Sequence, residues 1–276
     1  WRYSAYIFFS KLFGKKIILH IHGAEFIKFY QQSNFFGKNW IRLILKVPVK
    51  LIVLSKSWLN FFSSLNVNKN IEIIAPTTNF QNDIIEYKDN HLDLKYDQFS
   101  ILYFGGIDRR KGLIELVRSI LLIRKKYKIN FIIAGAKVKD EQNLFRLLEK
   151  FNNVFLFYPN VSEKKKVELF MKSHAYVLPS YAEGLPVTII EAMQSGLPVV
   201  TTKVGGIPDF FKEPDNGYLI EPGDIKSLTE GIIEIYRNKK LRDKITKNNI
   251  SLSSEKFNNQ KNMQIIKKIL ESILCE

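Results

Sequence analysis

The sequence of 276 residues contains little cysteine and no long apolar run. Its single cysteine, Cys275, excludes an intrachain disulfide and suits a reducing compartment. No stretch approaches the roughly 20 consecutive apolar residues that a membrane-spanning helix needs. At this length the chain has room for a large core and about two domains. We therefore expect a two-domain cytoplasmic protein.

Acidic residues are also scarce. The chain has 27 Asp and Glu against 42 Lys and Arg, which gives a formal net charge of +15. Neither a nucleic-acid recognition motif nor a clustered basic helix is present, so we expect no nucleic-acid partner. An anionic membrane surface is an alternative partner, because residues 1–16 (WRYSAYIFFSKLFGKK) interleave aromatic and basic side chains. The same segment also fits a helix that faces a domain core, and both interpretations stay open.

Two glutamates, Glu183 and Glu191, lie in the segment 179–200 (PSYAEGLPVTIIEAMQSGLPVV). The pattern predicts a loop after a buried strand, a helix over 186–194 with proline in its first turn, and a helix stop at Gly196. A helix N-terminus attracts anionic or polyhydroxyl ligands, and a carboxylate accepts hydrogen bonds from two adjacent hydroxyls. The pair could therefore hold a ribose and a second sugar. On the residues alone, two unrelated acids are the simpler interpretation.

A second segment, 99–120 (FSILYFGGIDRRKGLIELVRSI), predicts an apolar strand, a glycine turn with three basic residues, and an amphipathic helix. Gly105 and Gly106 let the backbone approach a ligand closely, and the basic side chains of residues 109–111 can neutralise phosphate. A solvated basic turn is the alternative. Alternating apolar strands and helices in this region favour a parallel, doubly wound sheet, in which ligands bind beyond the carboxyl ends of the strands.

The first third of the chain contains two histidines at the end of a predicted strand. Residues 15–26 (KKIILHIHGAEF) run from the strand into His20, His22 and a glycine turn, and alternation places both histidines on one side. A histidine in such a place is more often structural than catalytic. Glu25 is a weaker candidate, with an ordinary loop acid as the alternative. Residues 81–98 are polar and lack clear periodicity, so we expect an interdomain linker there.

The blocks EGLPVTIIEAMQSGLPVV, TTKVGGIPDF and NGYLIEPGD, in this order, closely resemble the donor-site signature of glycosyltransferase family 4, a retaining family with the GT-B fold. The resemblance implies an α/β protein of two Rossmann-like domains with parallel sheets. It also implies that Glu191 grips the ribose of a nucleotide-sugar donor and that Glu183 contacts the transferred sugar. The backbone from Gly184 through Leu185 and Pro186 would line the site.

The basic turn is similar to another part of the family. Lys111 and Gly112 match the Lys-Gly pair that binds the leaving diphosphate in these enzymes. The family often carries an arginine where this chain has Gly106. Arg110 or Arg109 is our candidate for its substitute.

The histidine strand resembles the acceptor-domain strand whose terminal histidine reaches the reaction centre in this family, and His22 is the better match. The family usually reads Pro-Asn-Gly-Val-Asp where residues 76–79 read Pro-Thr-Thr-Asn, so the contribution of that loop stays open. Several strands normally precede the histidine strand. We therefore expect the chain to lack roughly the first half of its acceptor domain, with that domain incomplete as a result.

The expected organisation has three parts. Residues 1–97 form a partial acceptor-binding domain plus linker, residues 98–254 form the donor-binding domain, and residues 255–276 form a helix that packs back toward the first domain.

The expected function is the retaining transfer of a sugar from a nucleotide-sugar donor to a hydroxyl of a glycan or lipid-linked acceptor, in cell-surface polysaccharide or glycolipid biosynthesis. The chain contains no Asp-x-Asp triplet, so we expect no metal and no other cofactor; Lys111 and its neighbours would stabilise the diphosphate. We expect the protein on the cytoplasmic side, peripheral on the inner face of the membrane. The predicted catalytic residues are His22 and Glu183, and the predicted donor-binding residues are Gly105, Gly106, Arg110, Lys111, Glu183, Gly184, Leu185, Pro186 and Glu191.

Two rival functions stay open. One is a non-catalytic, regulatory protein that binds a nucleotide sugar, and Gly106 together with the missing strands supports it. The other is a different GT-B enzyme, such as a sugar-nucleotide epimerase or a phosphorylase.

Overall fold

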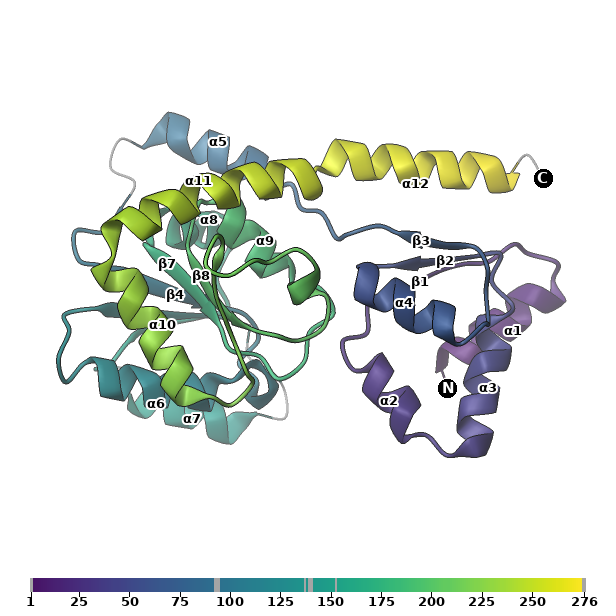
Figure 1. Cartoon of the computed structure of the whole chain (residues 1–276), viewed down its shortest axis with the longest axis horizontal. Helices are drawn as coiled ribbons and strands as arrows, with labels where there is room; N and C mark the ends of the chain where they lie inside the picture. The colour runs from purple at the N-terminus through teal and green to yellow at the C-terminus, as the bar shows by residue number, and fades with distance from the viewer. Residues whose placement is uncertain (1, 92–94, 137, 139–140, 152, 275–276) are drawn as a thin grey trace.

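The computed structural model describes residues 2–91, 95–136, 138, 141–151 and 153–274 (Figure 1). Cys275 lies outside these residues. The described chain forms two parallel sheets, one of three strands and one of six, each with helices packed against it. This arrangement confirms the expected α/β fold with two Rossmann-like domains, the first of them small.

The smaller sheet has the order β1-β2-β3, and all its strands are parallel. Alternation along β2 sends Leu51 and Val53 to one face, where they pack with the buried Trp58 and Phe62, and sends Ile52 to the other. The strands are β1 (Ile18–His20), β2 (Lys50–Val53) and β3 (Ile71–Ile73). The helices of this part are α1 (Arg2–Leu12), α2 (Phe26–Gln32), α3 (Phe35–Leu45) and α4 (Lys56–Ser64).

The larger sheet has the order β6-β5-β4-β7-β8-β9, again all parallel. The chain winds outward from β4 in one direction and then from β7 in the other, so the winding reverses between these two neighbours. In doubly wound sheets the crevice at that point is where ligands bind. The strands are β4 (Ser100–Phe104), β5 (Asn130–Gly135), β6 (Leu156–Pro159), β7 (Ala175–Leu178), β8 (Val199–Thr202) and β9 (Gly217–Ile220).

Helices cover both faces of the larger sheet and enclose the main hydrophobic core. The amphipathic helix predicted after the glycine turn is α6, and its apolar face is buried through Leu113, Leu116, Val117 and Ile120. The helices are α6 (Leu113–Ile123), α7 (Gln142–Lys150), α8 (Glu163–Lys172), α9 (Val187–Gln194), α10 (Ile225–Arg237) and α11 (Lys239–Lys256). No helix in the described chain is long and apolar enough to cross a bilayer.

The expectation of an irregular linker over 81–98 is wrong for its first part. Residues Phe80–Asn90 form helix α5, which packs against α8 and α9 of the larger domain. Phe80, Ile84 and Tyr87 follow helical spacing and belong to the main core, although most of the residues between them are polar. The chain therefore passes from one hydrophobic core to the other before α5.

The last helix, α12 (Asn259–Leu274), leaves the larger domain and lies along the smaller sheet (Figure 1). Ile269 packs with Ile52 and Ile74 on the sheet face opposite to α4. The Asn262 side-chain amide donates a hydrogen bond to the Ala75 carbonyl oxygen at 2.9 Å. The C-terminal helix thus gives the smaller sheet its second packed layer.

Candidate functional site

The candidate site lies at the carboxyl ends of β4 and β7, where the winding of the larger sheet reverses. The turn after β4 carries Lys111, and the loop after β7 carries Glu183. Sequence reasoning placed these two residues in separate motifs 72 positions apart, and the fold brings them together: Lys111 Nζ lies 2.7 Å from Glu183 Oε1.

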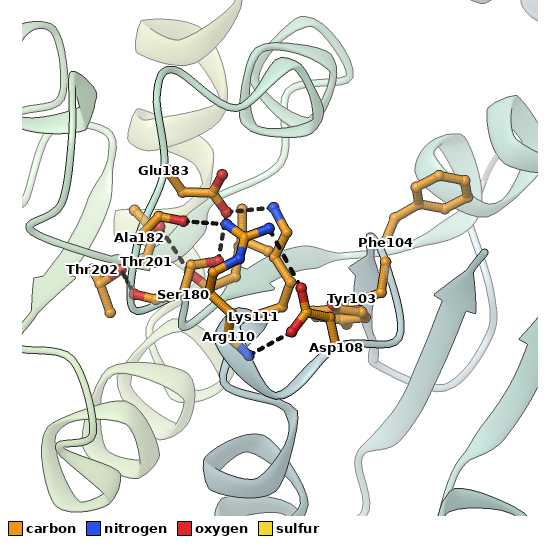
Figure 2. A network of polar contacts seen from close by, with 12 residues as sticks. Tyr103, Phe104, Asp108, Arg110, Lys111, Ser180, Ala182, Glu183, Thr201 and Thr202 are labelled. Carbon is orange, nitrogen blue, oxygen red and sulfur yellow. Dashed lines mark hydrogen bonds and ion pairs between the residues drawn. The ribbon is translucent and has the colours of Figure 1, made fainter. Parts of the chain in front are cut away.

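Glu183 is a buried carboxylate, with 5% of the residue exposed. Besides the ion pair with Lys111, its Oε1 accepts a 2.6 Å hydrogen bond from the Ser180 hydroxyl. Ser180 is itself fixed, because its carbonyl oxygen accepts a 2.6 Å bond from the Thr202 hydroxyl on β8 (Figure 2). A buried carboxyl group needs partners of this kind, so the loop holds the Glu183 side chain in one place.

The basic turn is a short 3-10 helix, Arg109–Lys111, that the Asp108 side chain caps by accepting from the Arg110 amide. The Arg110 guanidinium donates a 2.9 Å hydrogen bond to the Ala182 carbonyl oxygen, next to Glu183 (Figure 2). Arg109 instead pairs with Glu141 and is largely exposed. Of the two arginines considered, Arg110 is therefore the one placed at the site.

Two glycines permit the close approach of these loops. Gly112 and Gly205 both have left-handed backbones, with φ of 72° and 57°. A Cβ atom on Gly112 would lie 2.0 Å from the Pro179 carbonyl oxygen, and one on Gly205 would lie 2.0 Å from the Glu183 carbonyl oxygen. No side chain fits at either distance, so glycine is required for the site to form.

Glu191 lies on α9 and is 2% exposed. Its Oε1 is 2.7 Å from Lys166 Nζ and 3.5 Å from the Thr78 hydroxyl. Its Oε2 is buried without a hydrogen-bond partner among the described residues. Burial raises the pKa of the Glu191 carboxyl, while the hydrogen bond and the charge of Lys166 oppose that rise. An acceptor held in this way is suited to an incoming hydroxyl donor.

The loop Gly184-Leu185-Pro186 leads from Glu183 into α9. The helix begins at Val187, with Pro186 as its N-cap, one residue later than predicted. The Gly184 carbonyl oxygen accepts a 2.7 Å hydrogen bond from the Gly206 amide. Because α9 starts beside Glu183, its N-terminal partial positive charge faces the same region as Lys111 and Arg110.

The two histidines belong to the smaller domain, at the end of β1 and just after it. Their rings are 3.9 Å apart between centroids, which agrees with the predicted placement on one side of the strand. The pKa of His20 is lowered to about 4, chiefly by burial and secondly by the charge of His22. A Cβ atom on Gly184 would lie 3.0 Å from the His22 carbonyl oxygen, so the backbone of His22 adjoins the Glu183 loop.

A second contact fixes the domains near the site. The Asp209 carboxylate accepts hydrogen bonds from the Ser57 amide at 2.7 Å and the Ser57 hydroxyl at 2.5 Å, and so caps the first turn of α4. Asp209 belongs to the TTKVGGIPDF block, so this motif joins the two domains as well as supporting the Glu183 loop through Gly205 and Gly206.

The remaining predicted residues are placed as follows. Gly105 directly follows β4, and its amide donates to the Ala134 carbonyl oxygen at 3.0 Å. The Gly106 carbonyl oxygen accepts a 2.7 Å bond from the buried Tyr103 hydroxyl. Glu25 precedes α2 and makes no side-chain capping bond there.

Sequence reasoning missed Lys166, Ser180 and Asp209. Lys166 is one of three consecutive lysines on α8, and nothing local distinguishes it from its neighbours. Ser180 lies three residues before Glu183, within reach of its side chain in a tight loop, and could have been found by that spacing. Over the described residues, no group of three or more His, Cys, Asp and Glu side chains gathers in a way that could hold a metal ion.

Known proteins share sequence with this chain. The sequence profile of the family described as "Glycosyl transferases group 1" matches residues 85–252. An uncharacterized glycosyltransferase of Methanocaldococcus jannaschii is 26% identical over 98% of this chain and 71% of its own length. The capsular polysaccharide biosynthesis glycosyltransferase CapM of Staphylococcus aureus is 28% identical over 66% of this chain, which spans about half (48%) of CapM.

Solved structures share the fold. HepE of Anabaena, solved in complex with UDP, superposes with a TM-score of 0.79 at 19% identity, covering 98% of this chain and 76% of HepE. At that identity the likeness shows the GT-B fold alone. Together with the matched profile, which spans α5 to α11 and includes Lys111, Glu183 and Glu191, these findings show that the chain belongs to the family of glycosyl transferases group 1.

Proposed function

We propose that the chain is the donor-binding and partial acceptor-binding part of a retaining glycosyltransferase. It would move a sugar from a nucleotide-sugar donor to a hydroxyl of a glycan or lipid-linked acceptor. The observation that carries the proposal is the buried ion pair of Lys111 and Glu183 at the carboxyl ends of β4 and β7, beside the start of α9.

A bound donor would take the place of contacts that the site residues now make with one another. Its diphosphate would lie near Lys111 and Arg110, whose fixed positive charges stabilise the negative charge that develops as the glycosidic bond breaks. Its ribose diol would donate to Glu191, where one carboxylate oxygen lacks a partner among the described residues. The transferred sugar would then lie at Glu183.

The acceptor hydroxyl would approach from the smaller domain. His22 would face the transferred sugar and orient it with Glu183 while the acceptor attacks from the side that the leaving group vacates. The family resemblance supports retention of anomeric configuration. The capsular and teichuronic acid glycosyltransferases among the relatives support a role in cell-surface polysaccharide synthesis. We propose the inner face of the membrane as the place of action.

A thermal-shift panel of nucleotide sugars tests the donor, followed by an assay of nucleoside diphosphate release. A ligand at a hundred times its dissociation constant adds about 2.7 kcal/mol to the free energy of unfolding. Glu183→Gln should bind the donor but lose turnover. Glu221→Gln is the matched control, since Glu221 forms an exposed pair with Lys203 outside the site. Failure of every nucleotide sugar to raise the melting temperature contradicts the proposal.

A second candidate function is a nucleotide-sugar-binding protein without turnover. Gly106, at the place where the family often carries an arginine, favours it. Nucleotide-sugar binding to the parent chain without any hydrolysis or transfer, together with equal binding by Glu183→Gln, would support this alternative over the enzyme.

A further inference from the structure

The lysine that pairs with Glu191 comes from a run of three consecutive lysines on α8, Lys164, Lys165 and Lys166. Lys164 is exposed, and Lys165 pairs with Glu168 on the same helix at 2.9 Å. Lys166 instead extends to α9, where its Nζ lies 2.7 Å from Glu191 Oε1. Only 14% of the Lys166 side chain is exposed. Helix α8 therefore places one of its three adjacent cations against the buried carboxylate.

Aromatic rings enclose the Lys166 ammonium group. Its Nζ lies 5.2 Å from the centroid of the Phe80 ring, at the start of α5, and 5.7 Å from the centroid of the Phe104 ring, at the end of β4. Both distances permit cation–π attraction, which is stronger where water is excluded. The two rings and Glu191 therefore restrict the lysine side chain to one place, although its four-carbon stem is flexible in solution.

The Glu191 carboxylate uses one of its two oxygens for its hydrogen bonds within the described chain. Oε1 accepts from Lys166 at 2.7 Å and from the Thr78 hydroxyl at 3.5 Å, whereas Oε2 is buried without a partner among the described residues. A carboxylate has about four lone-pair sites, so its free capacity lies chiefly on Oε2. A buried acceptor without a partner is costly, and a ribose diol supplies two donors.

The charges around Glu191 decide whether its carboxyl group stays a pure acceptor. Burial raises the pKa of Glu191, the hydrogen bond and the charge of Lys166 lower it, Glu163 raises it, and a hydrogen bond from Thr78 lowers it. Glu163 also lies 3.5 Å from Lys166 but is 83% exposed. Burial raises the pKa of the nearby Tyr176 phenol well above its ordinary value, so that ring stays neutral. Among the described residues, Lys166 is therefore the cation that keeps Glu191 ionised.

We propose that Lys166 is a positioning residue, which holds the Glu191 carboxylate ready for the ribose hydroxyls and so makes the site select ribonucleotides over 2′-deoxyribonucleotides. The inference rests on the proposed function, because it names the residue that prepares the ribose subsite of the donor. Without Lys166, the Glu191 side chain would be free to turn and would bind a proton more readily. A protonated carboxyl has less capacity to accept from two hydroxyls.

Equilibrium binding of paired nucleotides tests this role without any sugar transfer. ADP, CDP, GDP and UDP are titrated into the parent chain by calorimetry, and the tightest of them is compared with its 2′-deoxy form. The deoxy form lacks one hydrogen bond to a charged acceptor, so the parent should prefer the ribonucleotide by more than about tenfold. The ratio of the two dissociation constants is the measured quantity, because ionisation of the diphosphate affects both nucleotides equally and cancels.

Lys166→Met should lower this ratio to less than about threefold at about pH 5.5, because Glu191 is then partly protonated and no longer held. The ionised fraction of Glu191 rises with pH, so the ratio should partly recover at about pH 8.5. The parent ratio should change less over the same range. Lys166→Arg keeps the cation and should restore a ratio that depends as weakly on pH as that of the parent.

Two control variants separate this role from a purely structural one. Lys165→Met removes the adjacent cation, which pairs with Glu168, and should leave the ratio unchanged. Glu191→Gln should abolish the selectivity, and adding Lys166→Met to it should change the ratio no further. Melting temperatures show whether each variant is folded. If Lys166→Met does not fold, Lys166→Gln takes its place, since its neutral amide keeps a polar group there and the same loss of selectivity is expected.

Three outcomes would overturn the inference and leave donor binding intact. The parent could bind a ribonucleotide and its 2′-deoxy form equally. Lys166→Met could weaken both nucleotides by the same factor, which would show a structural role alone. Lys166→Met could still lower the ratio in the Glu191→Gln background, so that its effect would not pass through Glu191. If none of the four diphosphates binds the parent, the proposed function itself fails, and the inference fails with it.

Discussion

The two domains of this protein differ in where their charged side chains lie and in whether these side chains are paired. The larger domain buries glutamates, Glu183 and Glu191, and gives each a lysine at 2.7 Å. The smaller domain leaves its cations with almost no acids and exposes most of the aromatic side chains found at the surface. A buried charge is costly unless it is paired, so the first arrangement indicates a fixed ligand site. The second arrangement leaves the smaller domain strongly basic, with most of the exposed aromatic rings on its surface.

The largest expected loss of stability comes from changes in the loops that shape the larger domain's site. Gly205→Ala would place a Cβ atom 2.0 Å from the Glu183 carbonyl oxygen, so we expect a loss of about 4 kcal/mol or more in the free energy of unfolding. Gly14→Ala in the smaller domain is the control: its φ is 66°, but no atom lies within 4 Å, and it should cost about 1 kcal/mol. Urea unfolding measures both. Equal losses would show that the loops are not tightly opposed.

The buried ion pairs should rank next. Lys166→Met leaves Glu191 buried without its cation and should cost about 3 kcal/mol near neutral pH. Lys165→Met, on the same helix, removes a half-exposed pair with Glu168 and should cost less than about 1 kcal/mol. Chemical unfolding of both variants gives the comparison.

The pH dependence of Lys166→Met has a definite sign. The pKa of the Glu191 carboxyl is already raised by burial, and loss of Lys166 raises it further. A raised carboxyl pKa favours folding at pH values below the unfolded pKa, and the benefit is lost as pH rises through the folded pKa. The penalty should therefore shrink as the pH is lowered toward about 5. A penalty that grows on acidification contradicts this assignment.

Helix α5 tests where one domain ends and the other begins. Ile84 is 4% exposed in the main core, and its neighbour Ile85 is 54% exposed. Ile84→Ala should cost about 2 kcal/mol or more and reduce hydrogen-exchange protection in β4 and β7, whereas Ile85→Ala should cost less than about 0.5 kcal/mol. If Ile84→Ala lowers protection in β1 and β2 instead, α5 belongs energetically to the smaller domain.

The smallest expected effect is the change of stability with pH that arises from two histidines, one from each domain. The pKa values of His20 and His174 are both lowered to about 4, in each case chiefly by burial, from an ordinary value near 6.5. Between these values the unfolded chain binds more protons than the folded one, so stability falls as pH drops from about 6.5 to about 4. Both rings are partly exposed, which limits the size of the effect.

His174 offers the clearer measurement, because its Nδ1 accepts a 3.1 Å hydrogen bond from the Ser100 amide, which protonation removes. Proton NMR should show both rings titrating near pH 4, and His174→Asn should flatten the slope of stability against pH. A His174 titration near its ordinary value would contradict the expected burial.

Much of the fold follows from local patterns. The strand, turn and helix around Lys111 were predicted in that order, and the helix after Glu183 was predicted over 186–194 against the observed Val187–Gln194. Both predictions were possible because proline, glycine and apolar spacing act within a few residues. Helix α5 was missed because only three of its eleven residues are buried apolar side chains, and the mostly polar residues between them hid the spacing. Its burial comes from α8 and α9, which lie far along the chain.

The candidate site, like the fold, was predicted in part from the sequence and in part was visible only in the structure. Sequence identified Lys111, Glu183 and Glu191 as separate motif residues and proposed Arg110, with Arg109 as the alternative substitute. In the structure the Arg110 guanidinium reaches the Ala182 carbonyl oxygen, whereas Arg109 pairs with Glu141. The roles of His22 and Glu183 in the reaction stay predictions, and Glu183→Gln tests the second of them.

The sequence by itself determined the doubly wound order of elements, the glycine turns and the family of this protein, because each depends on short-range patterns or on motifs. Only the tertiary structure decided which lysine forms an ion pair with which carboxylate. Lys165 and Lys166 are adjacent and chemically identical, yet one is paired at the surface and the other is buried against Glu191. That choice depends on the direction of one side chain relative to α9, a contact between residues 25 positions apart.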